Sequence, residues 1–185
     1  LLKKSLSLLF ERHHTMFSVF KQKDGNPYID IVPGEVKTDL IDFSQYPAED
    51  RRNKILDFAG ADSRKPFDIE NGPLYRLYLL KENEKSFYFH ATVHHLVFDG
   101  WSRRLFVIEL GNIYNALFSG KEYKPEPLLS YSYDFAKIES ETTDLEKENE
   151  MAGFWKEYLM DCPAELRLPL DRARPAFSSG LGRRL

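Results

Sequence analysis

Cysteine is almost absent from the sequence, which contains Cys162 and no other. An internal disulfide needs two cysteines, and no histidine or second cysteine stands beside Cys162 at a spacing typical of zinc ligands. We therefore expect no disulfide and no metal site. A lone cysteine is usual in proteins of the reducing cytosol, so the sequence indicates a cytoplasmic location.

Long apolar runs are missing as well. No segment approaches the roughly 20 consecutive apolar residues that a membrane-spanning helix needs. The start of the chain also lacks the charged-then-apolar layout of a signal peptide. We expect no association with a membrane.

The sequence has no excess of positive charge, because 26 lysines and arginines face 29 aspartates and glutamates, for a formal net charge of −3. Nucleic acids and anionic membranes both attract concentrated positive charge, so neither is an expected partner. The acidic run between residues 139 and 150 is interpreted as solvated surface. A Gly-rich phosphate loop and a recognisable nucleophile triad are also lacking.

Large apolar side chains, in contrast, are abundant. The 185 residues are 42% hydrophobic and include 14 Phe and 10 Tyr, enough to fill the core of one folded domain. The chain opens without a methionine and already inside a helix-like pattern. We therefore expect it to be a piece of something longer.

Apolar residues recur at helical or strand spacing along most of the chain. Helices are predicted from residue 2 to about 13 or 14 and over 47–61, 102–118, 131–140 and 145–160. Strands are predicted over 15–21, 28–32, 36–43, 74–81 and 86–94. Helices mixed with antiparallel hairpins predict an α/β fold, a two-layer sandwich of mixed or antiparallel sheet covered by helices. Residues 1–162 form the predicted domain, and 163–185, rich in proline, glycine and arginine, are interpreted as a linker or crossover segment.

The densest group of titratable residues lies at 94–100, between the last predicted strand and a predicted helix. Side chains alternate along a strand, so His94 and His95 should point apart. His95 would share a face with Phe89 and Val93. These apolar neighbours would partly desolvate the imidazole and favour its neutral form, which accepts a proton. His94 is interpreted as a structural hydrogen-bonding residue.

Asp99 and Gly100 complete this turn. An aspartate before a helix is a good cap, so Asp99 is expected to be structural, although it can serve chemistry by restraining the loop that holds His95. Gly100 would let a thin substrate arm pass. From spacing alone the pattern fits general-base catalysis, and equally a satisfied core histidine beside a capped helix.

Six blocks of the sequence resemble, in order, those of condensation domains of nonribosomal peptide synthetases. The turn and helix start, 94–102 (HHLVFDGWS), are similar to the family's HHxxxDGWS signature. The other blocks are 12–20, 66–74 (PFDIENGPL), 131–136, 154–159 (FWKEYL) and 168–175 (LPLDRARP). Together they cover nearly the whole chain.

This resemblance implies half of a chloramphenicol acetyltransferase-like fold, in which two such halves enclose the active histidine. It implies amide bond formation between a thioester donor and an aminoacyl acceptor, delivered on phosphopantetheine arms by upstream and downstream peptidyl carrier proteins, with no permanently bound cofactor. By similarity His95 is the catalytic or amine-positioning residue, His94 and Asp99 support it, and Gly100 leaves room for the arm. The C-terminal subdomain and the neighbouring adenylation domain would be missing, and the isolated fragment is expected to be inactive.

One departure from the family pattern concerns Asp99. The early block usually contains a second arginine, expected to pair with this aspartate, where the chain has Phe17. Arg12 is a candidate structural arginine in its place. The other candidates are Arg76, Arg103 and Arg104.

Two alternative functions stay open at this point. A stand-alone acyltransferase that uses coenzyme A and forms trimers would complete its site from a neighbouring subunit. A non-catalytic module would bind carrier proteins without turning over their cargo.

Overall fold

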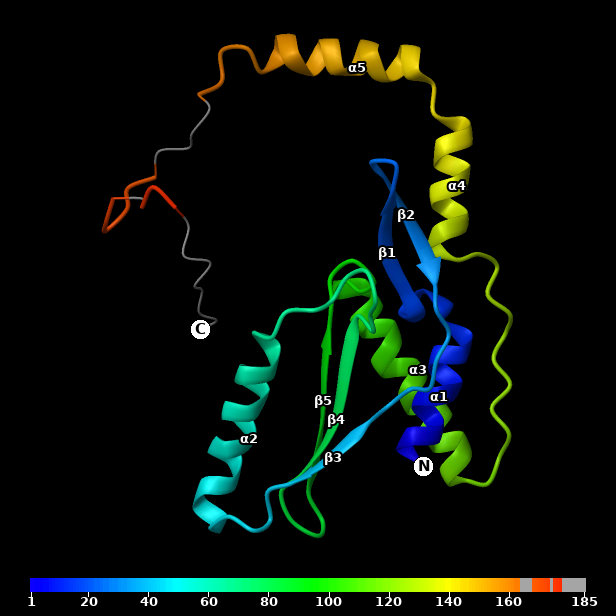
Figure 1. Cartoon of the computed structure of the whole chain (residues 1–185), viewed down its shortest axis with the longest axis vertical. Helices are drawn as coiled ribbons and strands as arrows, with labels where there is room; N and C mark the ends of the chain where they lie inside the picture. Colours follow the sequence, from blue (N-terminus) through cyan, green and yellow to red (C-terminus); the bar gives the residue numbers. More distant parts are fainter. Residues whose placement is uncertain (164–167, 174, 178–185) are drawn as a thin grey trace. The chain divides into compact units, whose positions relative to one another are not determined.

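The computed structural model describes residues 1–163, 168–173 and 175–177 (Figure 1). The chain divides into two compact units, Leu1–Glu141 and Thr142–Leu185. The helices are α1 (Leu2–Arg12), the 3₁₀ helix η1 (His14–Phe17), α2 (Ala48–Ser63), α3 (Gly100–Phe118), α4 (Ser132–Thr142) and α5 (Leu145–Tyr158). The strands are β1 (Ser18–Lys23), β2 (Asn26–Ile31), β3 (Asp39–Asp42), β4 (Tyr75–Lys81) and β5 (Phe87–Val93).

The described strands of the first unit form two sheets. β1 and β2 make an antiparallel hairpin, whose turn places Asp24 and Gly25 at φ values of 52° and 81°, as tight hairpin turns require. The second sheet has the order β3-β4-β5, with β3 parallel and β5 antiparallel to β4. The predicted mixed sheet is confirmed.

Helices cover both faces of the three-stranded sheet, α1 and α3 on one face and α2 on the other. Tyr75 and Leu77 of β4 belong to a core cluster shared with α1 and α3, two helices that lie side by side (Figure 1). Phe10 of α1 lies fully buried in this cluster, with its ring edge-on to Tyr75 at 4.6 Å. On the other face, Leu80 packs with Ile55 of α2.

All five predicted strands differ by one to three residues at one or both ends from those in the structure. The strand predicted from residue 15 begins at Ser18, because Met16 donates its N–H to the carbonyl of His13 and starts a 3₁₀ turn. The strand predicted over 36–43 is reduced to β3. β5 ends at Val93, one residue early, because the chain turns at His94, whose carbonyl accepts a hydrogen bond from Val97.

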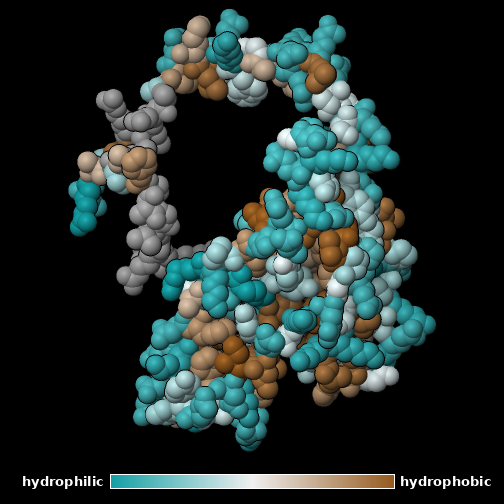
Figure 2. Space-filling view, in the orientation of Figure 1, coloured by the Kyte–Doolittle hydropathy of each residue, from teal (hydrophilic) through white to brown (hydrophobic). Residues whose placement is uncertain are grey.

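The second unit contains α5, which confirms most of the helix predicted over 145–160. Asp144 caps it by accepting hydrogen bonds from the N–H groups of Glu146 and Lys147. Apolar and charged surface are interspersed along α5 (Figure 2), and Phe154 and Trp155 are more than half exposed. Much of the predicted linker over 163–185 lies outside the described residues, so the boundary at 162 stays a prediction.

No helix in the described part of the chain is both long and apolar enough to cross a membrane.

The core beneath α2 gives a first testable prediction. Leu80→Ala should lower the free energy of unfolding by about 2–5 kcal/mol, because this substitution leaves a cavity where a side chain 1% exposed now packs. Leu40→Ala on the neighbouring strand, where the side chain is 58% exposed, is the matched control and should cost far less. Urea unfolding of the chain measures both, and equal losses would contradict this account of the core.

Candidate active site

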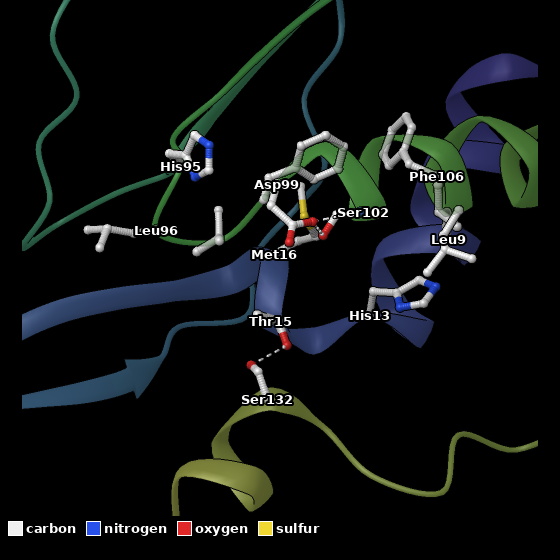
Figure 3. Close-up of a pocket in the computed structure, with 13 residues that line it drawn as sticks. Leu9, His13, Thr15, Met16, His95, Leu96, Asp99, Ser102, Phe106 and Ser132 are labelled. Atoms are coloured by element: carbon white, nitrogen blue, oxygen red, sulfur yellow. Dashed lines mark hydrogen bonds between the residues drawn. The ribbon is translucent and has the colours of Figure 1, made fainter. Parts of the chain in front are cut away.

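A cavity of about 350 Å³ opens beside the turn that follows β5. Its walls come from α1, η1, the 95–98 turn and the first turns of α3, with Ser132 at the start of α4 (Figure 3). Figure 3 shows His95 and Leu96 on one side of the labelled side chains and His13 and Leu9 on the other. All of these residues belong to the first unit, so one compact body builds the cavity.

His95 lies on the turn and lines the cavity. The prediction that it shares an apolar face with Phe89 and Val93 is wrong, because β5 ends at Val93 and the side chain of His95 is exposed. Alternation along a strand cannot orient a residue beyond the strand's end. The imidazole is therefore open to solvent and to a ligand.

His94 has a different environment from its neighbour. Its backbone N–H donates to the carbonyl of Leu74 at 2.9 Å, which closes the sheet, and its Nδ1 accepts a hydrogen bond from the N–H of Leu96 at 3.1 Å. A nitrogen that accepts a hydrogen bond carries no proton, so this geometry selects the tautomer with the proton on Nε2. The ring also lies edge-on to Phe67, with centroids 5.7 Å apart.

The remaining three histidines also have side-chain partners. Nε2 of His13 lies 2.6 Å from Oε2 of Glu109, and Nε2 of His90 lies 3.2 Å from Oδ2 of Asp62. The His14 ring stacks on Tyr131 at 5.4 Å. Within the part of the chain that the structure describes, His95 is thus the one histidine whose ring has no hydrogen bond, ion pair or aromatic contact.

Asp99 is the N-cap of α3. Its Oδ1 accepts hydrogen bonds from the N–H and the hydroxyl of Ser102, each at 2.7 Å (Figure 3). These hydrogen bonds, that from the backbone N–H first, hold the pKa of Asp99 below its ordinary value of 3.8. The carboxylate stays ionised and complements the positive end of the helix.

Gly100 is the first residue of α3, and its backbone does not need a glycine. Positive φ values occur at Gly25, Gly72 and Gly120 among the described glycines, but not at Gly100. A Cβ at Gly100 would meet no described atom within 4 Å. The fold itself therefore gives no reason for a glycine at this position.

None of the candidate arginines pairs with Asp99 among the described residues. Arg12 instead forms an ion pair with Glu109 of α3, whose carboxylate also accepts the hydroxyl hydrogen bond of Tyr123. Arg76 pairs with Asp62 at the end of α2. Arg103 and Arg104, on the first turn of α3, form no ion pair with Asp99 in the described chain either.

Phe17, which stands where the family's second arginine is usual, is half-buried and packs against the core. Its ring lies edge-on to Phe10 at 5.8 Å, against the cluster of α1, α3 and the sheet. Among the described residues, Asp99 accepts hydrogen bonds from the neighbouring Ser102 instead of pairing with an arginine.

Two charged residues that the sequence patterns did not single out, Glu109 and Asp62, form ion pairs between elements of the first unit. Glu109 is the one acidic residue of α3 and follows four apolar residues, 105–108, and this contrast was a usable signal in the sequence. Asp62 stands among other charged residues near the end of α2, so its complete burial had no signal in the sequence.

A histidine turn at the carboxyl end of a strand, beside a capped helix and a cavity, is the arrangement of α/β domains that bind ligands at strand ends. A family model of the condensation domain matches residues 1–182, and the chain belongs to the condensation domain family. Of the functions left open by the sequence, this membership supports the condensing type.

Similar proteins include large synthases. The chain is 33% identical over 180 residues to a linear gramicidin synthase of Brevibacillus parabrevis, a match covering 97% of this chain and 2% of that protein. It is 34% identical over 181 residues to surfactin synthase subunit 2 of Bacillus subtilis (strain 168), a match covering 98% of this chain and 5% of that protein. The chain thus spans a small fraction of these relatives' length.

Solved structures share the fold. The first condensation domain of the calcium-dependent antibiotic synthetase, in complex with a substrate analogue, matches with a TM-score of 0.73 and 24% identity, over 88% of this chain and 39% of that one. The starter condensation domain of rhizomide synthetase matches with a TM-score of 0.73 and 17% identity, over 90% of this chain and 41% of that one. The expected chloramphenicol acetyltransferase-like α/β fold is confirmed.

The cap of α3 leads to a prediction about pH. Asp99→Ala should lower the free energy of unfolding at pH 7, because the first turn of α3 loses an acceptor. The pKa of Asp99 is lowered by folding, so its contribution is present above the unfolded-state pKa and is lost as the pH falls through the folded-state value, below 3.8. Urea unfolding of both proteins from pH 7 to about pH 2.5 should therefore show the difference shrinking at the acidic end.

Ser102→Ala, which removes one of the two hydrogen bonds to Oδ1, is the control and should have a smaller effect. A difference between wild type and Asp99→Ala that is constant over this pH range would contradict the ionised cap.

Proposed function

We propose that this chain supplies the histidine-bearing half of an active site that forms amide bonds in nonribosomal peptide synthesis. The donor is an acyl or aminoacyl thioester and the acceptor an aminoacyl group, each tethered to a carrier protein. Family membership supports the reaction class. The observation that carries the assignment of the site is the imidazole of His95 at the edge of the cavity, which has no side-chain partner among the described residues.

The proposed step joins the acceptor amine to the donor carbonyl. The amine nitrogen attacks the thioester carbon, a C–N bond forms, and the C–S bond breaks. His95 accepts a hydrogen bond from the amine, takes its proton as the nitrogen becomes an amide, and returns the proton to the leaving thiolate. A ring nitrogen free of protein partners is what this exchange needs, and general-base assistance of this kind accelerates reactions by about 10²- to 10⁴-fold.

The residues around His95 are proposed to orient it. His94 ties the turn to the sheet through Leu74, and Asp99 ties it to the start of α3. Holding a reacting group in place removes much of the entropic cost of the step. Neither residue needs to touch the substrate in this proposal.

Gly100 is proposed to leave a passage for the phosphopantetheine arms. Neither φ nor neighbouring atoms call for glycine there, and Gly100 lies between Asp99 and Ser102, which line the cavity, so a ligand in the cavity is the proposed reason for the missing side chain. The arms would belong to the upstream and downstream peptidyl carrier proteins, and no cofactor would be bound permanently.

The chain is proposed to be the N-terminal subdomain of a larger condensation domain. It corresponds to 39% and 41% of the two solved condensation-domain chains. Residues 1–162 would form the subdomain and 163–185 the crossover to the C-terminal subdomain, with an adenylation domain as a neighbour. The isolated chain would then be inactive, because half of its site is missing.

His95→Ala is the central test of this function. In the synthetase that contains this sequence, loaded with its own amino acids, the variant should form condensed product about 10²- to 10⁴-fold more slowly, the loss typical of a missing general base. Single-turnover mass spectrometry of the carrier-bound product measures the rate. His14→Ala, which changes a histidine of the same chain outside the cavity lining, should keep near-normal rates. Near-normal condensation by His95→Ala would refute the assignment.

Gly100→Ala tests the proposed passage separately. The substitution should leave the free energy of unfolding unchanged or slightly higher, because alanine favours helices. Condensation should fall about 10-fold or more, because a Cβ displaces the tethered arm from the reacting position. Gly111→Ala, on the same helix with equally open surroundings, is the matched control and should keep its activity. Equal rates for the two variants would contradict the passage.

A further inference from the structure

We propose that Phe67 is a positioning residue for the active site, which orients the ring of His94 and through it the turn that presents His95. This inference rests on the proposed function, in which His95 acts on the amine. Phe67 belongs to the sequence block 66–74. It contacts Arg76 on one side and His94 on the other, so this block links the sheet to the histidine turn. A continuous path of contacts leads from a buried carboxylate on α2 to the turn.

The path begins at Asp62, whose side chain is completely buried. Arg76 of β4 donates from Nε to Oδ1 of Asp62 at 2.9 Å and from Nη2 to the backbone carbonyl oxygens of Asp62 and Lys65 at 2.8 and 3.1 Å. Hydrogen bonds from separate nitrogens fix the plane of a guanidinium as well as its position. Arg76 is therefore a rigid support.

Phe67 lies on this support. Its ring centroid is 4.0 Å from Cζ of Arg76, within the range of a cation–π contact. The side chain of Phe67 is half-buried in the loop between α2 and β4. An immobilised guanidinium against the ring restricts the orientations that the ring adopts.

The ring of Phe67 in turn meets that of His94. The centroids are 5.7 Å apart and the planes 87° apart, an edge-to-face arrangement. The same imidazole accepts the hydrogen bond from the N–H of Leu96 at 3.1 Å. The histidine side chain has two torsions, so the contact with Phe67 and the hydrogen bond from Leu96 together set the orientation of the His94 ring. Because Leu96 follows His95 directly, rotation of the His94 ring would release a hydrogen bond inside the turn.

The backbone hydrogen bonds of the turn do not involve the Phe67 ring. The N–H of His94 donates to Leu74, and that of Val97 donates to His94. A change at Phe67 should therefore preserve the end of β5 and disturb the orientation of the imidazole. This separation makes a positioning role distinguishable from a role in stability.

The first measurement is made on the chain itself, labelled with ¹⁵N in histidine. In the wild type the His94 ring should show a bare Nδ1 and a protonated Nε2. Phe67→Leu, which removes the aromatic face, should shift His94 toward an average of both tautomers. Phe67→Tyr, which restores the ring, should return the wild-type signals. Phe58→Leu is the matched control, because Phe58 is also half-buried and edge-on to an aromatic ring, that of Tyr78.

The second measurement is condensation by the synthetase that contains this sequence. Phe67→Leu should lower kcat about 10-fold or more with KM for the loaded carriers unchanged, because a displaced His95 loses alignment without losing substrate binding. Phe67→Tyr should recover most of the rate, and Phe58→Leu should leave it near the wild-type value.

Each outcome decides the proposal. It is overturned if Phe67→Leu leaves the His94 signals unchanged, or if those signals change while kcat does not. Should Phe67→Leu fail to unfold cooperatively, Arg76→Lys makes the same test, since lysine keeps the charge beside Asp62 but loses the flat guanidinium against Phe67. Unchanged His94 signals in that variant also overturn it. Failure of the proposed function is seen independently, as condensation by His95→Ala at normal rates.

Discussion

The buried carboxylate of Asp62 is the interaction on which the arrangement of the first unit depends. Its side chain has no exposed surface, so its charge is tolerated only because several donors converge on it. Burial alone would raise the pKa of Asp62, but hydrogen bonds from Thr92, His90 and Arg76 outweigh burial and hold the pKa below its ordinary value. Since these donors lie on β4 and β5, one carboxylate joins α2 to both strands that lead to the histidine turn.

The alternation of side chains along β4 separates a polar network from the core that supports the cavity. Tyr75 and Leu77 face α1 and α3, whereas Arg76 and Tyr78 face α2 and Asp62. The end of β5 at Val93 then gives the two following histidines unlike surroundings. The ring of His94 contacts the turn and Phe67, whereas the ring of His95 has no such contact among the described residues.

Most helices and strands, and the cap formed by Asp99, could be predicted because they arise from neighbours within a few residues. Ion pairs between distant segments could not. Asp62 and Arg76 are 14 residues apart, and His13 and Glu109 are 96 apart, so their pairing depends on how the helices pack on the sheet. The motif pattern predicts an arginine partner for Asp99, but the chain satisfies that carboxylate locally through Ser102.

Short-range patterns were sufficient for the family, the mixed α/β fold and the position of the histidine turn, because motif spacing and apolar periodicity are properties of adjacent residues. The folded chain was needed to show that His95 is exposed and has no partner among the described residues, while the ring of His94 lies edge-on to Phe67. It was also needed to show that Arg12 forms an ion pair with Glu109 and that Phe17 packs against the core. The physical reason is that a strand's last residue and a charge's partner are set by long-range packing, which local sequence does not specify.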